Sequence, residues 1–101
     1  MKNKELAVLV TTELKGVFFG YTDQNHEEIL KTGICTLKNA RNCIYWTDVR
    51  GFLGLANYGP SPECRIGPSV SRLSLNKVCS ISIVSDEAVK LWENHPWQFK
   101  K

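Results

Sequence analysis

A group of aromatic, amide and guanidinium side chains near the middle of the chain has the composition of a ligand site. Arg41 stands between two amides, Asn39 and Asn42, and the aromatic pair Tyr45 and Trp46 follows. Guanidinium groups and aromatic rings stack on flat ligands, and carboxamides both donate and accept hydrogen bonds. The same residue types also fit an ordinary hairpin in which the two rings pack against Phe18 or Phe19. Both interpretations remain open on the sequence alone.

Positive charge is concentrated around this group. The 101 residues carry a formal net charge of +3, low for a domain with a strongly basic nucleic-acid-binding face. All four arginines lie between positions 41 and 72, and the segment from Lys38 to Lys77 holds six cationic and two acidic side chains, a local charge of +4. Arginine pairs with phosphate through two parallel hydrogen bonds. We therefore predict Arg65 as a second anion contact beside Arg41.

Other kinds of site are disfavoured by residue spacing. The four cysteines lie 8, 21 and 15 residues apart, without the short Cys and His spacings that zinc sites use. Gly51 and Gly54 lack the third glycine of a dinucleotide fingerprint. A Cys/His nucleophile pair would need His26 or His95, which we expect in a solvated loop and at a helix end. The sequence thus predicts a binding surface with no catalytic residue, no metal and no cofactor.

The segments around these residues predict a small sheet. A loop is expected over 23–28, and a polar connection over 39–42 should join two strands into a hairpin. Three cysteines, at 35, 43 and 79, are expected as small core residues. The clearest alternation of apolar and polar residues begins at Lys77. The expected strands are 5–14, 17–22, 28–38, 43–47, 64–68, 71–75 and 77–84.

One helix is predicted with good start and stop signals. Ser85 can cap a helix over 85–94, two acids in its first turn suit the helix dipole, and Ala88, Leu91 and Trp92 share a face. A shorter helical turn with Asp48 as its cap is expected over 48–56. The dipeptide 95–96 should end the C-terminal helix, because a residue before proline avoids helical geometry.

These elements predict an α+β fold. It consists of a small antiparallel β-sheet built from hairpins with one C-terminal α-helix, in a single domain covering residues 1–101. A chain of this length has a modest core, so we expect it to form a homo-oligomer. It has no apolar run of signal-peptide or membrane-span length, and its cysteines lack a secretory context. A cytoplasmic protein with no membrane partner is therefore expected.

Four motifs in order resemble a family of small uncharacterised proteins encoded by tailed phages and prophages. The resemblance covers roughly residues 5 to 97, and the segments that carry it are 17–21, 37–46, 51–56 and 59–68. It implies a phage accessory protein and transfers no catalytic residue. Small phage accessory proteins commonly counter host defence, and one such class consists of oligomeric sponges that sequester cyclic nucleotide immune signals without cleaving them.

The leading hypothesis combines the residue types with this resemblance. It is a non-enzymatic, oligomeric, anti-defence sponge that binds a small anionic nucleotide such as a cyclic dinucleotide. Arginines would pair with phosphates, an aromatic ring would stack on a base, and amides would read base edges. The predicted ligand-binding residues are Asn39, Arg41, Asn42, Tyr45, Trp46 and Arg65.

Two alternatives belong to other functional classes. The first is a protein-binding inhibitor of a host defence enzyme or nuclease, which would use Trp97 and Phe99 in the tail together with the basic middle of the chain. The second, weaker one is binding of single-stranded nucleic acid, whose affinity would fall steeply with salt. Long nucleic acid is not expected as the main partner, because the net charge is low.

Overall fold

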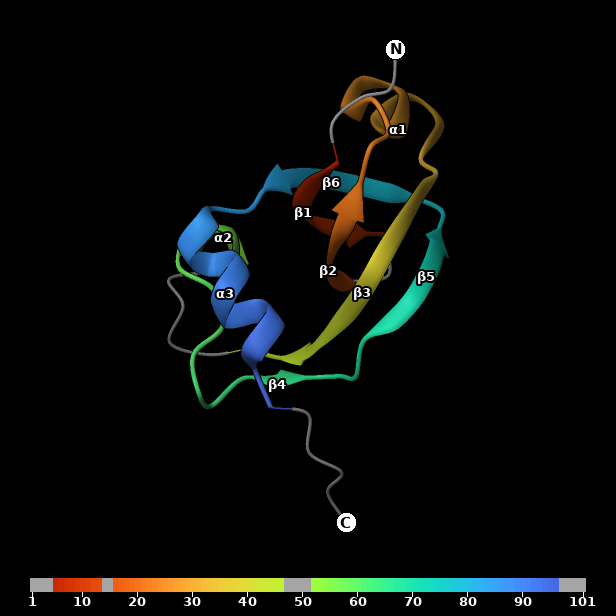
Figure 1. Cartoon of the computed structure of the whole chain (residues 1–101). Coiled ribbons are helices and arrows are strands. Elements are labelled where there is room, and N and C mark those ends of the chain that lie inside the picture. Colours follow the sequence, from red (N-terminus) through yellow and green to blue (C-terminus); the bar gives the residue numbers. More distant parts are fainter. Residues whose placement is uncertain (1–4, 14–15, 47–51, 97–101) are drawn as a thin grey trace.

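The computed structural model describes residues 5–13, 16–46 and 52–96 (Figure 1). These residues form an antiparallel sheet of six strands and three helices, which confirms the predicted α+β class and the C-terminal helix. In chain order the elements are β1 (Leu6–Thr12), β2 (Val17–Thr22), α1 (His26–Thr32), β3 (Cys35–Tyr45), α2 (Phe52–Asn57), β4 (Arg65–Ile66), β5 (Val70–Leu75), β6 (Val78–Ile83) and α3 (Asp86–Asn94).

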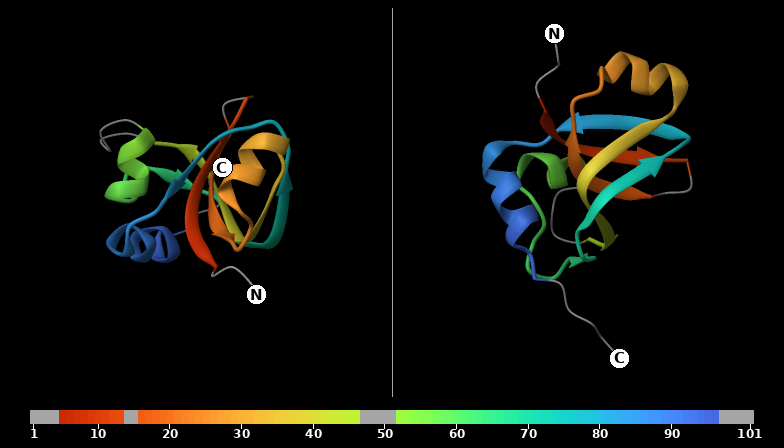
Figure 2. Two further views of the ribbon diagram at one scale, coloured as in Figure 1. Left: turned by 90° about the horizontal axis from the view of Figure 1, so that it is seen from above. Right: turned by 45° about the vertical axis from the view of Figure 1, so that its right-hand side comes forward.

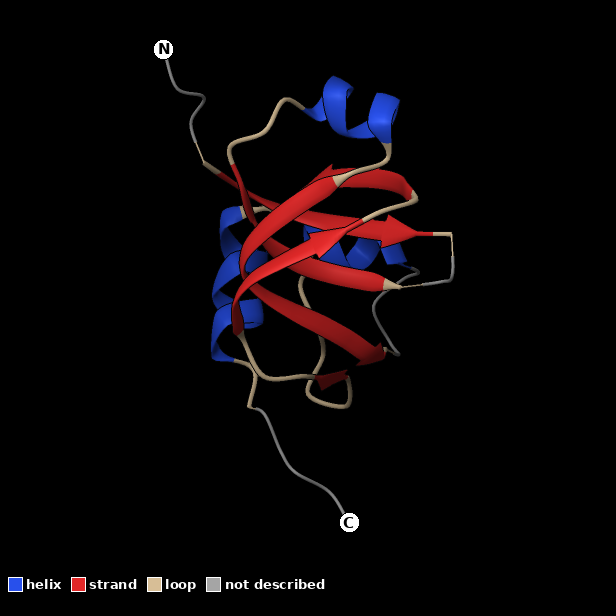
Figure 3. Cartoon of the chain, turned by 90° about the vertical axis from the view of Figure 1, so that its right-hand side faces the viewer, coloured by secondary structure: helices blue, strands red, loops and turns tan. Residues whose placement is uncertain are grey.

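The sheet rolls up on itself. Its hydrogen-bonded neighbours follow the order β4-β3-β2-β1-β6, and β5 also pairs with β3. β5 and β6 thus lie at opposite ends of the pairing order, yet only Asn76 and Lys77 separate them in the chain. Three Cα–Cα steps span at most about 11 Å, so the sheet must curve until its two ends approach. Figure 3 shows the strands crossing one another in this curved arrangement.

Side chains on the two faces of the rolled sheet form two cores. Alternation along β1 places Val8 and Val10 on one face and Leu9 on the other. The inner cluster, enclosed by the sheet, consists of Val8, Val10, Ile29, Cys35, Leu37, Ala40 and Val78. The helix-side cluster consists of Leu9, Val17, Phe19, Cys43, Leu55, Ala56, Cys64, Ile66, Val84, Ala88 and Trp92.

The three helices cover different parts of the sheet. α2 and α3 lie side by side against the helix-side cluster, whereas α1 sits over one end of the roll (Figures 1 and 2). Ile29 of α1 is fully buried and completes the inner cluster. Both faces of the central strands are therefore covered, and this explains how a chain of this length buries two sets of apolar side chains.

α1 corrects one prediction. The segment 23–28 was expected as a loop and 28–38 as a strand, but a helix occupies His26–Thr32. The Asn25 side chain accepts a hydrogen bond from the Glu28 amide at 3.1 Å, and Gly33 ends the helix in a left-handed conformation with φ of 76°. His26 is accordingly the first helical residue rather than a solvated loop residue, and its buried Nε2 has no hydrogen-bond partner in the described structure.

β3 corrects a second prediction. The polar segment 39–42 was expected to turn between two paired strands, but one strand runs without interruption from Cys35 to Tyr45. Its first half pairs with β5 and its last residues pair with β4, along the edge opposite β2. Asn39 takes a left-handed conformation with φ of 49° at a bulge against β2. The predicted hairpin between strands over 28–38 and 43–47 is therefore wrong.

The other described elements follow the expectations closely. β1, β2, β4, β5 and β6 lie within one or two residues of the predicted strands. Ser85 caps α3 by accepting a hydrogen bond from the Ala88 amide at 3.1 Å, and His95 ends the helix. Of the three residues predicted to share its apolar face, Ala88 and Trp92 are buried and Leu91 is exposed. α2 lies inside the predicted helical turn, whose expected cap, Asp48, lies outside the described residues.

Replacing Gly20 with alanine is expected to lower the free energy of unfolding by roughly 1–3 kcal/mol. An added Cβ would lie 2.8 Å from Leu37 Cβ, which is anchored in the inner cluster and cannot move aside. Urea unfolding followed by circular dichroism measures the loss. Gly67→Ala is the matched control, because an added Cβ there meets its nearest atoms at 3.7 Å or more. Equal losses in both variants would contradict the predicted clash.

Candidate functional site

Arg41 is a buried connector between three parts of the fold. β3 places it opposite Phe19, and its side chain is only 6% exposed. Its Nε donates to the Gly67 carbonyl at 2.7 Å, and its Nη1 donates to the carbonyls of Trp92 and His95, both at 2.8 Å. The last two carbonyls belong to the C-terminal end of α3, where the helix dipole favours a cation.

Burial also lowers the pKa of Arg41, although a guanidinium remains protonated at neutral pH. The charge is thus held inside the protein by three backbone carbonyls rather than presented to solvent. Arg41 was predicted to pair with a phosphate. The structure gives its guanidinium a structural use instead, as a donor to three backbone carbonyls.

Three of the predicted residues meet at the end of β3. Tyr45 lies directly opposite Arg65 in the antiparallel register of β3 and β4, and Trp46 follows Tyr45. Tyr45 is 53% exposed, Trp46 is 37% exposed and Arg65 is also exposed. In the described part of the chain Arg65 makes no ion pair, so its guanidinium is available to an anion. We call Tyr45, Trp46 and Arg65 the Tyr45 surface.

The two predicted amides lie apart from the Tyr45 surface. Asn39 is exposed at the bulge of β3, six residues before Tyr45. Asn42 pairs with Phe18 across the sheet, and its carbonyl accepts a hydrogen bond from the Gly67 amide at 2.8 Å. Because Asn42 lies between two inward residues of the helix-side face, its own side chain points to the opposite face. The six predicted residues therefore do not converge on one site.

Phe19 has other ring partners than those expected from a hairpin. Its ring stacks on Trp92 with centroids 5.1 Å apart and planes 3° apart, and it meets Tyr21 edge-on at 5.4 Å. Phe18 packs against the inner cluster on the other face. Tyr45 instead remains half-exposed at the end of its strand. This arrangement favours the surface interpretation of Tyr45 over the core interpretation.

Tyr21 on β2 is engaged in contacts within the fold. Its hydroxyl donates to a Glu93 carboxylate oxygen on α3, and its ring packs against the helix-side cluster. Partial burial, followed by the hydrogen bond to Glu93 and the charge of Glu93, raises the pKa of Tyr21 well above its usual range. The phenol therefore stays protonated and ties β2 to α3.

The buried cysteines are packing residues of the two clusters. Cys35, Cys43 and Cys64 are buried, whereas Cys79, which was also expected in the core, is exposed. Burial, with a smaller contribution from Cys64, raises the pKa of Cys43 to about 12, and burial raises the pKa of Cys35. A thiol must ionise to act as a nucleophile or metal ligand. In the described residues no group of three His, Cys, Asp or Glu side chains is placed to hold a metal ion.

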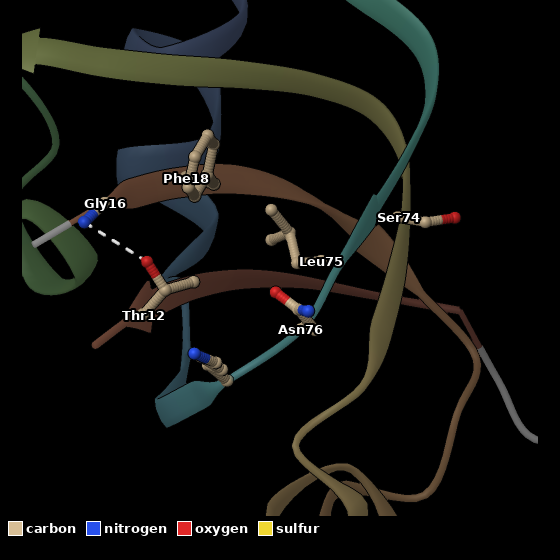
Figure 4. A pocket seen from close by; sticks show the side chains of 7 residues that line it. Thr12, Gly16, Phe18, Ser74, Leu75 and Asn76 are labelled. Atoms are coloured by element: carbon tan, nitrogen blue, oxygen red, sulfur yellow. Dashed lines mark hydrogen bonds between the residues drawn. The ribbon is translucent and has the colours of Figure 1, made fainter. Parts of the chain in front are cut away.

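A pocket that the sequence did not suggest lies between the β1–β2 turn and the β5–β6 turn (Figure 4). Its volume is about 330 Å³. The lining residues come from three strands, β1, β2 and β5, and from the connections beside them: Thr12, Gly16, Phe18, Ser74, Leu75, Asn76 and Lys77. The only feature of the local sequence near this pocket is the short polar link 76–77, and this link is typical of an ordinary turn.

Comparison with known proteins identifies a family. Residues 5–92 match the model of a family described as a domain of unknown function, DUF6948. No curated protein and no solved structure matches the chain. Among the described residues, no helix is long and apolar enough to cross a lipid bilayer.

Proposed function

Since the chain belongs to the DUF6948 family, whose description names no activity, we propose from the geometry of the site that it is a non-enzymatic protein that binds a small anionic nucleotide. The supporting observation is the cross-strand pair of Tyr45 and Arg65, an exposed ring beside an exposed guanidinium. Stacking of a base on an aromatic ring contributes roughly 1–3 kcal/mol, and arginine binds phosphate in a bidentate geometry. Trp46, the next residue along the chain, is a second exposed ring.

The resemblance to small phage accessory proteins suggests the use of such binding. In this proposal the chain acts in the cytoplasm of an infected cell, where it sequesters a cyclic nucleotide immune signal and leaves it intact. A homo-oligomer would bring several Tyr45 surfaces together. Light scattering coupled to size-exclusion chromatography measures the oligomeric state, and a monomer at micromolar concentration would remove this part of the proposal.

Isothermal titration against a panel of cyclic dinucleotides and cyclic ADP-ribose isomers is expected to show binding of at least one member. Arg65→Gln should weaken that binding roughly tenfold or more, because a charge-assisted hydrogen bond to phosphate is lost. Tyr45→Ala should weaken it by a similar factor through loss of stacking. Arg72→Gln, which removes the same charge from an exposed position on β5, is the matched control and should bind as the wild type does.

The panel also separates the functional classes. Chromatography of the ligand after incubation should return it unchanged, and a hydrolysed ligand would point to an enzyme. A well-folded sample that gives no heat with any member would refute nucleotide binding.

The inhibitor alternative predicts stoichiometric recovery of a host protein in a pull-down. Its predicted contacts, Trp97 and Phe99, lie outside the described residues.

A further inference from the structure

β5 and β6 separate immediately after the turn that borders the pocket of Figure 4. In an ordinary two-residue hairpin the strands would pair with each other, but β5 pairs with β3 and β6 pairs with β1. The Val78 amide donates to the Gly33 carbonyl at 3.0 Å, and the Lys77 carbonyl accepts from the Glu13 amide at 3.0 Å. The backbone of the turn is therefore held by its neighbours, and the pocket lies beside it, between the end of β5 and the neighbouring ends of β1 and β2.

The floor of this pocket is apolar. Phe18 and Leu75 line it, and each is only partly buried against the inner cluster. Figure 4 shows Leu75 pointing toward Phe18 and Ser74 pointing away. Thr12 accepts a hydrogen bond from the Gly16 amide at 3.2 Å, so its hydroxyl proton remains available for a ligand oxygen. An apolar surface with a few polar groups at its edge is typical of a small-molecule site.

The edge of the pocket carries a cation. Lys77 lines the pocket, is exposed, and makes no ion pair in the described part of the chain. Its backbone is left-handed, with φ of 56°, a conformation that a residue with a Cβ rarely adopts. The two hydrogen bonds around the turn hold it there. Glu13, an exposed acid, contacts Lys77 through its backbone amide.

We propose that this pocket binds a small carboxylate that has an apolar, ring-sized body. The body would lie on Phe18 and Leu75, and the carboxylate would pair with Lys77 and accept the Thr12 hydroxyl proton. A volume of about 330 Å³ is at the lower end of ligand pockets, so the ligand is small. This site shares no residue with the Tyr45 surface, and the inference does not depend on nucleotide binding there.

The test uses three probes of one shape: 3-phenylpropanoate, 3-phenylpropan-1-ol and 3-phenylpropylamine. Titration into the ¹⁵N-labelled full chain, followed by two-dimensional NMR, reports both affinity and location. We expect the carboxylate to shift the amide resonances of Gly16, Leu75 and Lys77. It should bind with about two- to fivefold higher affinity than the alcohol, and its advantage in affinity over the amine should be larger still. Shifts confined to other parts of the chain, or equal binding of all three probes, would overturn the proposal.

Two variants test the assignment to named residues. Lys77→Asn removes the charge and keeps a residue type that tolerates left-handed backbone, so it should erase the preference for carboxylate over alcohol. In Gly16→Ala the new Cβ would lie 2.6 Å from Phe18 Cε2 and 2.8 Å from Thr12 Oγ1 and displace both, so all probes should bind more weakly. Lys90→Asn on α3 is the control for net charge and should bind as the wild type does. Unchanged carboxylate preference in a folded Lys77→Asn variant would refute the role of Lys77.

Discussion

Arg41→Met is expected to lower the free energy of unfolding by roughly 2–4 kcal/mol, because three backbone carbonyls lose charge-assisted hydrogen bonds at once. The carbonyls belong to Gly67, Trp92 and His95, so the substitution disconnects β3 from the segment after β4 and from the end of α3. Methionine keeps much of the apolar stem and so isolates the loss of the guanidinium. Urea unfolding followed by far-ultraviolet circular dichroism gives the value.

Two further variants make this prediction specific. Arg41→Lys keeps a cation but has a single ammonium in place of the planar guanidinium, so an intermediate loss is expected. Arg72→Met removes an exposed arginine from β5 and should change stability by no more than about 0.5 kcal/mol. If Arg41→Met were as stable as Arg72→Met, the contacts of Arg41 with the three carbonyls would not stabilise the fold. The predicted role of Arg41 as a phosphate contact would then have to be considered again.

Trp92→Ala is expected to cost roughly 3–5 kcal/mol, the usual range for removing a fully buried aromatic side chain. Trp92 is 0% exposed, stacks on Phe19, and donates from Nε1 to the Leu55 carbonyl at 3.0 Å. It therefore joins α3 to both β2 and α2. The same unfolding measurement applies, with loss of cooperativity as a second sign that the helices have separated from the sheet.

The phenylalanine variant divides this effect into two parts. Trp92→Phe keeps a ring against Phe19 but leaves the Leu55 carbonyl without its donor, so we expect a loss of about 1–3 kcal/mol. Lys90→Ala in the same helix is exposed and should lie within about 0.5 kcal/mol of the wild type. An alanine variant that lost no more than the lysine control would show that α3 does not depend on this contact.

The sequence predicted best those elements whose signals are local. The alternation over 77–84 and the Ser85 cap each specify an element without help from distant residues, and both elements were found. α1 was missed because a helix of two turns is too short to show a clear apolar period, although its cap residues Asn25 and Gly33 were present in the sequence.

β3 was misjudged for a different reason. A bulge at Asn39 breaks the alternation of inward and outward side chains, so the polar stretch around it resembles a turn. The strand is nevertheless continuous, because β2 lies along one edge and β4 and β5 along the other. Those partner strands are distant in the sequence, and no local pattern around β3 predicts them.

Contacts between residues distant in the sequence also limited the prediction of the candidate site. The residue types of Tyr45, Trp46 and Arg65 suggested a surface, and their exposure agrees with one. Arg41 has the same local signal, but its acceptors come from Gly67, Trp92 and His95, and only the tertiary fold brings them together. The pocket beside the β5–β6 turn was not predicted because its lining residues come from two separate stretches, 12–18 and 74–77, that only the tertiary fold brings together.

The position of β1 between β2 and β6 also has a consequence for synthesis on the ribosome. β1 pairs Val8 with Ile83, and Thr11 shares a hydroxyl hydrogen bond with Ser80, 69 residues away. The nascent chain can form the β1–β2 hairpin early, but one edge of that hairpin stays open until β6 has emerged. Closure of the roll thus waits for the synthesis of β6, and a chain that lacks β6 exposes the edge along which neighbouring chains could pair.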